Sequence, residues 1–246
     1  MCTGMRFNDT EGRMFFGRNL DWTFDYGERA LVVPRGFKPA SPFGATSEIS
    51  HALIGMGIVE EGQPLLFDAG NDAGLAVAGL NFPGYAEYAP APIEGKTNVA
   101  AWEFPLWVAA NFATVDEVAA ALQDAVIVDE PIAPEWPSAL LHWIIGDATR
   151  SIVVEYTAAG MQVFENPVDA FSPISPVTAG TPRTCAITST YPAPSIARAH
   201  SASRSLHSVR VLPSAACPAT TVRPRVSSAP RMSTRTIPPR TTRRPT

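Results

Sequence analysis

The chain has 246 residues, a formal net charge of −4, 46% hydrophobic residues and three cysteines. This length fits one large domain or two small ones. No apolar run approaches the roughly 18 residues of a membrane span, and the N-terminus lacks the features of a signal peptide, so we expect a cytoplasmic protein. The cysteines indicate no disulfide framework, and no Cys/His spacing resembles a metal site.

Residues 1–169 predict a folded unit that is rich in strands. Strands are expected at residues 2–7 and 14–20, joined by the polar turn 8–12. Further strands are predicted, in chain order, at residues 30–33, 52–59, 64–67, 74–82, 141–145, 151–156 and 161–164.

Two helices are predicted in the middle of this unit. The first covers residues 104–112, where apolar side chains recur near helical spacing. The second begins at Thr114, because Thr114 and Glu117 have the spacing of a capping box. Strand pairs on both sides of two helices favour layered α+β packing over a parallel βαβ array.

The composition changes after Asp169, the last acidic residue. Residues 170–246 hold 11 Arg, no Lys, no Asp or Glu, and 12 of the 24 prolines. The rest of the chain therefore holds 19 − 11 = 8 basic against 23 acidic residues. Such a segment does not bury enough apolar area to offset its ordering entropy, so we expect a disordered tail.

Cys2 is the first candidate for chemistry. If Met1 is removed, a thiol nucleophile and a free α-amine belong to one residue. An α-amine titrates near ~7.7–8, so it can take and return a proton at neutral pH, as N-terminal nucleophile enzymes require. Taken alone, a cysteine at position 2 is more often a residue without special chemistry.

Two further segments carry polar residues that can support such a thiol. If residues 14–20 form a hairpin with the first strand, Arg18 and Asp21 approach Cys2; a guanidinium favours the thiolate, and a carboxylate can hold the α-ammonium. The alternative is a surface Arg–Asp pair, which contributes little. Asn81 ends an apolar strand and can donate to an oxyanion, although asparagine is also frequent in turns.

Several segments together resemble the choloylglycine hydrolase family, in its bile salt hydrolase branch. The matches are collinear and run from residue 1 to about residue 169. They are Met1-Cys2-Thr3-Gly4, Gly17-Arg18-Asn19-Leu20-Asp21-Trp22, Asn81-Phe82-Pro83-Gly84-Tyr85, Phe104-Pro105-Leu106-Trp107, Leu141-His142-Trp143-Ile144-Ile145-Gly146-Asp147 and Ser151-Ile152-Val153-Val154-Glu155.

The resemblance implies the four-layer αββα sandwich of N-terminal nucleophile (Ntn) hydrolases, with Cys2 on a central strand. It implies hydrolysis of the linear amide that joins a steroid acyl group to glycine or taurine. Cys2 is then the nucleophile, Arg18 and Asp21 support it, and Asn81 belongs to the oxyanion site. Asn81 also favours the bile salt branch, because penicillin V acylases tend to carry Tyr there.

The resemblance also sets the expected partners. The partner is a small conjugated bile salt, with no cofactor or metal, no nucleic acid and no membrane, and a fully folded protein is expected to form a homo-oligomer, often a tetramer in this family. Four apolar residues lie close in sequence to the matched motifs and are expected to contact the substrate: Leu20, Phe24, Phe67 and Ile132.

The resemblance ends near residue 169. The family continues with a catalytic Thr-Asn pair and a later catalytic Arg, whereas the expected place for the Asn here reads Ala170-Phe171-Ser172-Pro173. We therefore expect residues 1–169 to be the N-terminal portion of an Ntn-hydrolase domain whose C-terminal part is missing or out of frame. A frameshift near residue 170 in a GC-rich gene explains an Arg-rich tail without Lys or acids.

Four alternatives stay open. The first is a penicillin V acylase-type amidase, and the second is an incomplete, inactive homologue. The third is a papain-like Cys–His enzyme, for which only His51 and His142 lie before the tail. The fourth is a binding protein with a basic arm, for which steep salt dependence of nucleic-acid binding is the discriminating observation.

Overall fold

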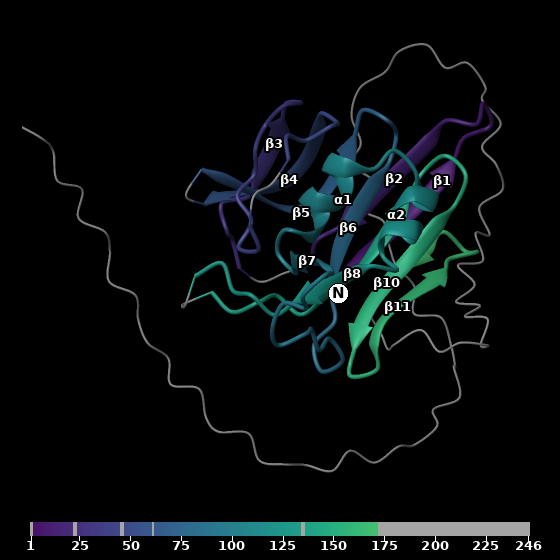
Figure 1. Ribbon diagram of the computed structural model, residues 1–246. Coiled ribbons are helices and arrows are strands. Elements are labelled where there is room, and N and C mark those ends of the chain that lie inside the picture. The colour runs from purple at the N-terminus through teal and green to yellow at the C-terminus, as the bar shows by residue number, and fades with distance from the viewer. Residues whose placement is uncertain (1, 22–23, 45–46, 61, 134–135, 172–246) are drawn as a thin grey trace, which may run out of the picture. The chain divides into compact units, whose positions relative to one another are not determined.

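The computed structural model describes residues 2–21, 24–44, 47–60, 62–133 and 136–171 (Figure 1). Most of the predicted tail, residues 172–246, lies outside the described residues. The elements are β1 (Thr3–Asn8), β2 (Met14–Asn19), β3 (Arg29–Val33), β4 (Leu53–Glu60), β5 (Gln63–Asn71), β6 (Ala76–Asn81), β7 (Thr97–Ala100), α1 (Phe104–Asn111), α2 (Val115–Ala121), β8 (Ala125–Val128), β9 (Leu141–Gly146), β10 (Ser151–Thr157), β11 (Gly160–Glu165) and β12 (Ala170–Phe171).

Two antiparallel sheets carry most of these strands. The smaller sheet has the order β12-β1-β2, and the larger one has the order β11-β10-β9-β6-β5-β4-β3. β1 lies against β6 and β9 of the larger sheet (Figure 1). The predicted hairpin of the first two strands is confirmed, with Gly4 opposite Arg18.

The larger sheet has a different apolar layer on each face. Its helix-side face joins α1 and α2 in one large cluster, in which Phe104, Val118 and Trp143 are fully buried. Its other face contributes to a smaller cluster that also includes Cys2 and Phe171 from the smaller sheet. The described residues therefore form a helical layer and two sheet layers, and the α+β prediction is confirmed.

A parallel strand pair was missed by the sequence reasoning. β7 and β8 pair in parallel, and α1 and α2 connect them. Each strand has four residues, too few to establish a periodicity. The predicted N-cap of the second helix is confirmed, because the Thr114 hydroxyl accepts from Glu117 N and the Glu117 carboxylate accepts from Ala113 N.

The small sheet continues two residues past the expected boundary at Asp169. Ala170 and Phe171 form β12 and pair with Met5 and Gly4 of β1. Both residues were expected to belong to the tail. The side chain of Phe171 is buried between the sheets, which gives this segment apolar contacts that a disordered tail lacks.

Arg6 connects β1 to the end of the described chain. Its guanidinium is buried, donates to the backbone carbonyl of Asp147 at 2.8 Å, and pairs with the Asp169 carboxylate at 2.7 Å. A buried guanidinium needs such partners, because an unpaired buried charge is strongly destabilising. These contacts fix the N-terminal strand, which begins directly after Cys2.

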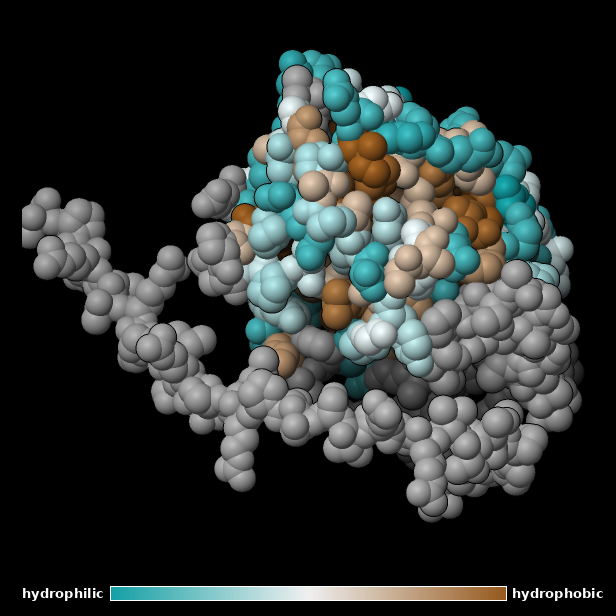
Figure 2. Space-filling view, turned by 60° about the horizontal axis from the view of Figure 1, so that its bottom comes forward, coloured by the Kyte–Doolittle hydropathy of each residue, from teal (hydrophilic) through white to brown (hydrophobic). Residues whose placement is uncertain are grey.

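The outer face of the small sheet remains partly exposed and apolar. Met5, Phe7 and Phe15 are 42%, 51% and 46% exposed, and the two phenylalanine rings stack. Within the described residues, both helices lie on the side of the large sheet that faces away from the small sheet, and neither helix covers this outer face. On the face that Figure 2 shows, apolar residues form separate brown patches among hydrophilic ones.

Candidate active site

Cys2 immediately precedes β1 and is buried between the two sheets. It is only 3% exposed and packs in the cluster that includes Leu80, Ile144 and Phe171. Side chains alternate along a strand, so Cys2, Gly4 and Arg6 face the same interior. The thiol is therefore placed in a largely apolar environment, close to the side of the large sheet that β6 and β9 form.

Gly4 permits the close approach of the two sheets beside Cys2. A Cβ atom at this position would lie 2.7 Å from Ile144 Cγ2 and 3.6 Å from Leu80 Cδ1. The sequence Cys2-Thr3-Gly4 thus places a residue without a side chain where β1 crosses the larger sheet. This finding gives a packing reason for the glycine.

Arg18 lies on β2, on the same face of the hairpin as Cys2. The register pairs Thr3 with Asn19 and Gly4 with Arg18. Cys2 is therefore two positions from the residue opposite Arg18, which makes the two side chains diagonal neighbours within reach of a long side chain. The hypothesis that a hairpin brings this guanidinium toward the thiol is consistent with the register.

The Arg18 side chain is nearly buried and pairs with a carboxylate from the larger sheet. Only 6% of the side chain is exposed, and Nη1 donates to Asp68 Oδ2 at 3.2 Å. The sequence motifs predict Asp21 as the supporting carboxylate, not Asp68. The available signal was a single carboxylate at the end of the apolar run Leu65-Leu66-Phe67.

Asp21 is exposed and lies two residues beyond the end of β2. If the hairpin register continues for one more residue, Leu20 lies opposite Cys2, and Asp21 follows at the open end of the hairpin. This position suits a carboxylate that acts on the terminal amine more than one that acts on the thiol.

Asn81 is the last residue of β6, and its backbone N–H and C=O point away from β9. The next residue, Phe82, donates its N–H to the Leu140 carbonyl at 2.8 Å. In an antiparallel ladder the hydrogen-bonded pairs alternate, so the pair of Asn81 and Leu141 is not hydrogen-bonded. The Leu141 backbone instead exchanges hydrogen bonds with the Tyr88 hydroxyl.

The Asn81 N–H therefore points toward the side of β5. The pairing of β5 with β6 ends at Asp68 and Ala78, before Asn81 is reached. Strand alternation puts the Asn81 side chain on the face opposite to Leu80, which packs with Cys2. The geometry thus favours the backbone N–H of Asn81 over its side-chain amide as an oxyanion donor.

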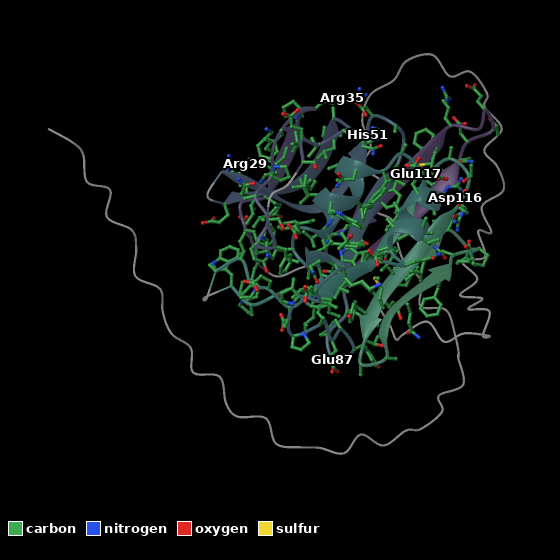
Figure 3. All side chains as sticks on the ribbon, in the orientation of Figure 1. Arg29, Arg35, His51, Glu87, Asp116 and Glu117 are labelled. Carbon is green, nitrogen blue, oxygen red and sulfur yellow. The ribbon has the colours of Figure 1, made fainter. Side chains whose placement is uncertain are left out.

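The two histidines before the tail have different surroundings. His51 lies near Arg35 at one edge of the molecule (Figure 3), and its ring is 3.3 Å from Asp72. His142 is fully buried, with Nδ1 3.4 Å from Glu155 Oε1 and its ring stacked on Phe82. His51 therefore contacts Asp72, whereas the His142 ring lies between Phe82 and Phe171.

The four residues expected to contact substrate have different surroundings. Leu20 and Phe24 are 37% and 67% exposed, and the half-buried Phe67 packs edge-on against Tyr26. Ile132 lines a cavity of about 370 Å³ together with Trp102 and Trp136, and none of the other three lines it. Their common role in substrate binding stays a prediction.

A second cavity, of about 360 Å³, opens beside the Arg18–Asp68 pair. Its lining combines these two charged residues with apolar ones, among them Phe16 and Met56.

In the part of the chain that the structure describes, no group of three or more metal-ligating side chains comes together, and no helix is long and apolar enough to cross a membrane.

The chain matches known proteins over its first 174 residues. The matching family model is that of linear amide C–N hydrolases, choloylglycine hydrolase family, and it covers residues 2–174. A bile salt hydrolase/transferase from Bifidobacterium longum subsp. longum is 53% identical over 173 residues, which are 70% of this chain and 54% of that protein. A conjugated bile acid hydrolase from Lactobacillus gasseri is 45% identical over 167 residues, covering 68% and 53%. The chain spans about half the length of the curated relatives it matches.

Solved structures agree with this result. The R18L variant of a conjugated bile acid hydrolase from Clostridium perfringens matches with a TM-score of 0.68 and 40% identity, over 72% of this chain and 54% of that one. A penicillin V acylase from Agrobacterium tumefaciens matches with a TM-score of 0.55 and 24% identity, over 70% and 53%. The second likeness shows the fold alone, and together they confirm the predicted Ntn-hydrolase fold class.

Proposed function

Because the chain belongs to the choloylglycine hydrolase family of linear amide C–N hydrolases, we propose that it hydrolyses the amide of glycine- or taurine-conjugated bile salts with Cys2 as the nucleophile. The observation that carries the proposal is the placement of Cys2 directly before β1, on the same face of the hairpin as Arg18. Relatives named for bile salt or conjugated bile acid hydrolysis, at 53% and 45% identity, support the substrate class.

The proposed reaction begins after removal of Met1. The Cys2 thiolate, favoured by the Arg18 guanidinium, attacks the amide carbonyl carbon and forms a C–S bond. The backbone N–H of Asn81 stabilises the oxyanion. The α-ammonium of Cys2, oriented by Asp21, protonates the leaving nitrogen, and the C–N bond breaks to release glycine or taurine.

The second half of the reaction regenerates the thiol. Water attacks the thioester carbonyl while the α-amine of Cys2 takes its proton. The C–S bond then breaks, and the steroid acid leaves. In this scheme one residue supplies both the nucleophile and the base, and Arg18, Asp21 and Asn81 act on charges that develop during the reaction.

We further propose the extent of the hydrolase domain, the location of the protein and its assembly. Residues 1–169 are proposed as the N-terminal portion of the hydrolase domain, and the Arg-rich composition of residues 170–246 supports a shifted reading frame. The proposed location is the cytoplasm, and the proposed assembly of a fully folded form is a homo-oligomer. Resequencing the gene around codon 170 tests the frame.

The experiment that tests the substrate class compares two amides on the purified chain. We expect release of taurine from taurocholate to exceed release of phenoxyacetate from penicillin V, and Cys2→Ala to abolish both. Faster cleavage of penicillin V would assign the chain to the acylase alternative. Blocking the α-amine distinguishes the Cys–His alternative, because a Cys–His pair does not need that amine.

A further inference from the structure

The ion pair between Arg18 and Asp68 joins the two sheets at the candidate site. Arg18 comes from the small sheet and Asp68 from the large one, and their side chains are 6% and 23% exposed. Within the described residues, Asp68 is the acceptor that the structure provides for this guanidinium, whose Nε is buried without a hydrogen-bond partner. A charge in such a place depends on its partner for its position.

A β-bulge determines the face on which Asp68 lies. The register of β4 and β5 pairs Met56 with Asp68 and Gly57 with Leu66, which leaves Phe67 as the extra residue. Leu66 and Ala69 both belong to the helix-side cluster although they are three residues apart. In a regular strand they would lie on opposite faces, so the bulge resets the alternation and turns Asp68 toward the small sheet.

The surrounding backbone holds the Asp68 carboxylate in place. Met56 N donates to Asp68 Oδ1 at 3.1 Å, while Oδ2 accepts from Arg18. Gly55 and Gly57 allow the two strands to meet at the bulge, because a Cβ at either position would lie 2.0 Å from a carbonyl oxygen of β5. Each carboxylate oxygen of Asp68 thus has its own hydrogen-bond donor.

We propose that Asp68 is a positioning residue that holds the Arg18 guanidinium on the Cys2 side of the hairpin. The proposal rests on the proposed function insofar as Arg18 supports the Cys2 thiolate. Asp68 acts through Arg18, because the hairpin register relates Arg18 to Cys2 and the described contacts of Asp68 are to Arg18 and Met56. Without Asp68, the arginine can turn toward solvent or the adjoining cavity, and the thiolate loses its support.

The test is a double-mutant cycle on the full chain, with the rate of Cys2 alkylation by iodoacetamide at pH 7 as the readout. Mass spectrometry of the Cys2 peptide separates this thiol from Cys185 and Cys217. We expect Asp68→Ala and Arg18→Leu each to slow Cys2 alkylation about five-fold or more, and the double variant to be no slower than Arg18→Leu, because coupled residues are not additive. Two results would overturn the proposal. The first is a double variant in which the two single effects on the alkylation rate multiply, and the second is a parent-like rate in Asp68→Ala while Arg18→Leu is slow.

Two further variants keep the result interpretable. Asp72→Ala is the matched control, since Asp72 also accepts from an arginine, Arg35, but at an exposed site; we expect its alkylation rate to equal that of the parent. If Asp68→Ala does not fold by circular dichroism, Asp68→Asn preserves the shape without the charge and is expected to give an intermediate rate. A parent-like rate in Asp68→Asn then counts against the proposal.

The same proteins also separate this inference from the proposed function. Taurine release measures the hydrolase activity, and alkylation measures the state of the Cys2 thiol without any substrate. If no taurine is released but the alkylation pattern holds, the function fails and the role of Asp68 stands. If taurine is released and the alkylation rate does not change in Asp68→Ala, the proposed function stands and the role of Asp68 fails. In an active protein, we expect Asp68→Ala to lower kcat and to leave KM nearly unchanged.

Discussion

Glu103 is a buried carboxyl group that the sequence reasoning did not single out. It is 8% exposed, and its Oε1 accepts from Ala100 N at 2.8 Å and from the Ser41 hydroxyl at 3.2 Å. Burial raises the pKa of Glu103 from 4.5 to about 7, although both hydrogen bonds oppose the change. Near neutral pH this group therefore lowers the stability of the fold.

Replacing Glu103 by Gln is predicted to stabilise the protein in a pH-dependent way. Between pH 4.5 and about 7 the folded state retains a proton that the unfolded chain releases, so the free energy of unfolding falls as pH rises through this range. Glutamine keeps an oxygen acceptor and removes the titration. We expect a gain of up to roughly 3 kcal/mol at pH 8 and almost none at pH 4.5, measured by urea unfolding. An equal gain at both pH values would contradict this assignment.

At the residue scale, the sequence predicts the hairpin that relates Cys2 to Arg18, but not the contacts around this pair. Cys2 and Arg18 were proposed together from a hairpin, and the register supports that relation. Asp68 was missed because it follows a bulged residue, and a bulge shifts the side-chain alternation without a clear sequence signal. Asn81 was predicted as an oxyanion donor, and the choice of its backbone N–H over its side chain rests on the hydrogen-bond pattern of β9.

Among the elements, the hairpin of β1 and β2 provides a matched pair of glycine substitutions. Gly4 faces the large sheet, and a Cβ there meets Ile144 Cγ2 at 2.7 Å, whereas Gly17 has nothing within 4 Å. We expect Gly4→Ala to lower the free energy of unfolding by about 1–3 kcal/mol through overpacking, and Gly17→Ala to change it by less than about 0.5 kcal/mol. Equal urea midpoints for the two variants would refute the close approach of the sheets.

The N-terminus of α2 gives a second prediction for an element. The Thr114 hydroxyl accepts from Glu117 N at 3.2 Å and satisfies one free donor of the first turn. Thr114→Ala is expected to cost about 1 kcal/mol of stability in thermal or urea unfolding. Thr10→Ala, at an exposed turn position, serves as the control, and an equal loss in both variants would exclude a capping role.

The longer elements were predictable because their apolar patterns are long. The strands β9 and β10 and both helices agree with the sequence prediction within a few residues. β5 was expected to end at Phe67 but continues to Asn71. The sequence did not reveal this extension, because the residues after the bulge are small or polar and no longer alternate as in a regular strand. β7, β8 and β12 are too short for periodicity to reveal them.

For the whole molecule, the exposed apolar face of the small sheet predicts self-association. Phe7 and Phe15 stack with their centroids 5.3 Å apart and are about half exposed, and exposed apolar patches promote association. Replacing both by Thr, which suits a strand, should reduce concentration-dependent association in sedimentation velocity. Val32→Thr, at a 72% exposed position of β3, is the control. An equal reduction by the control would contradict a role for this particular face.

The layers of the fold were also predictable in part. The α+β class followed from the order of strands and helices, and the family resemblance added the sandwich. The sequence did not predict which sheet faces pack together, because an apolar strand face can pack against any other apolar face.

The most direct test of the central proposal is mass spectrometry of the protein during incubation with taurocholate. The account predicts a chain that lacks Met1, releases taurine, and carries a transient choloyl thioester on the Cys2 peptide that is absent from Cys2→Ala. Taurine release from a chain that retains Met1, or undiminished release by Cys2→Ala, would contradict it.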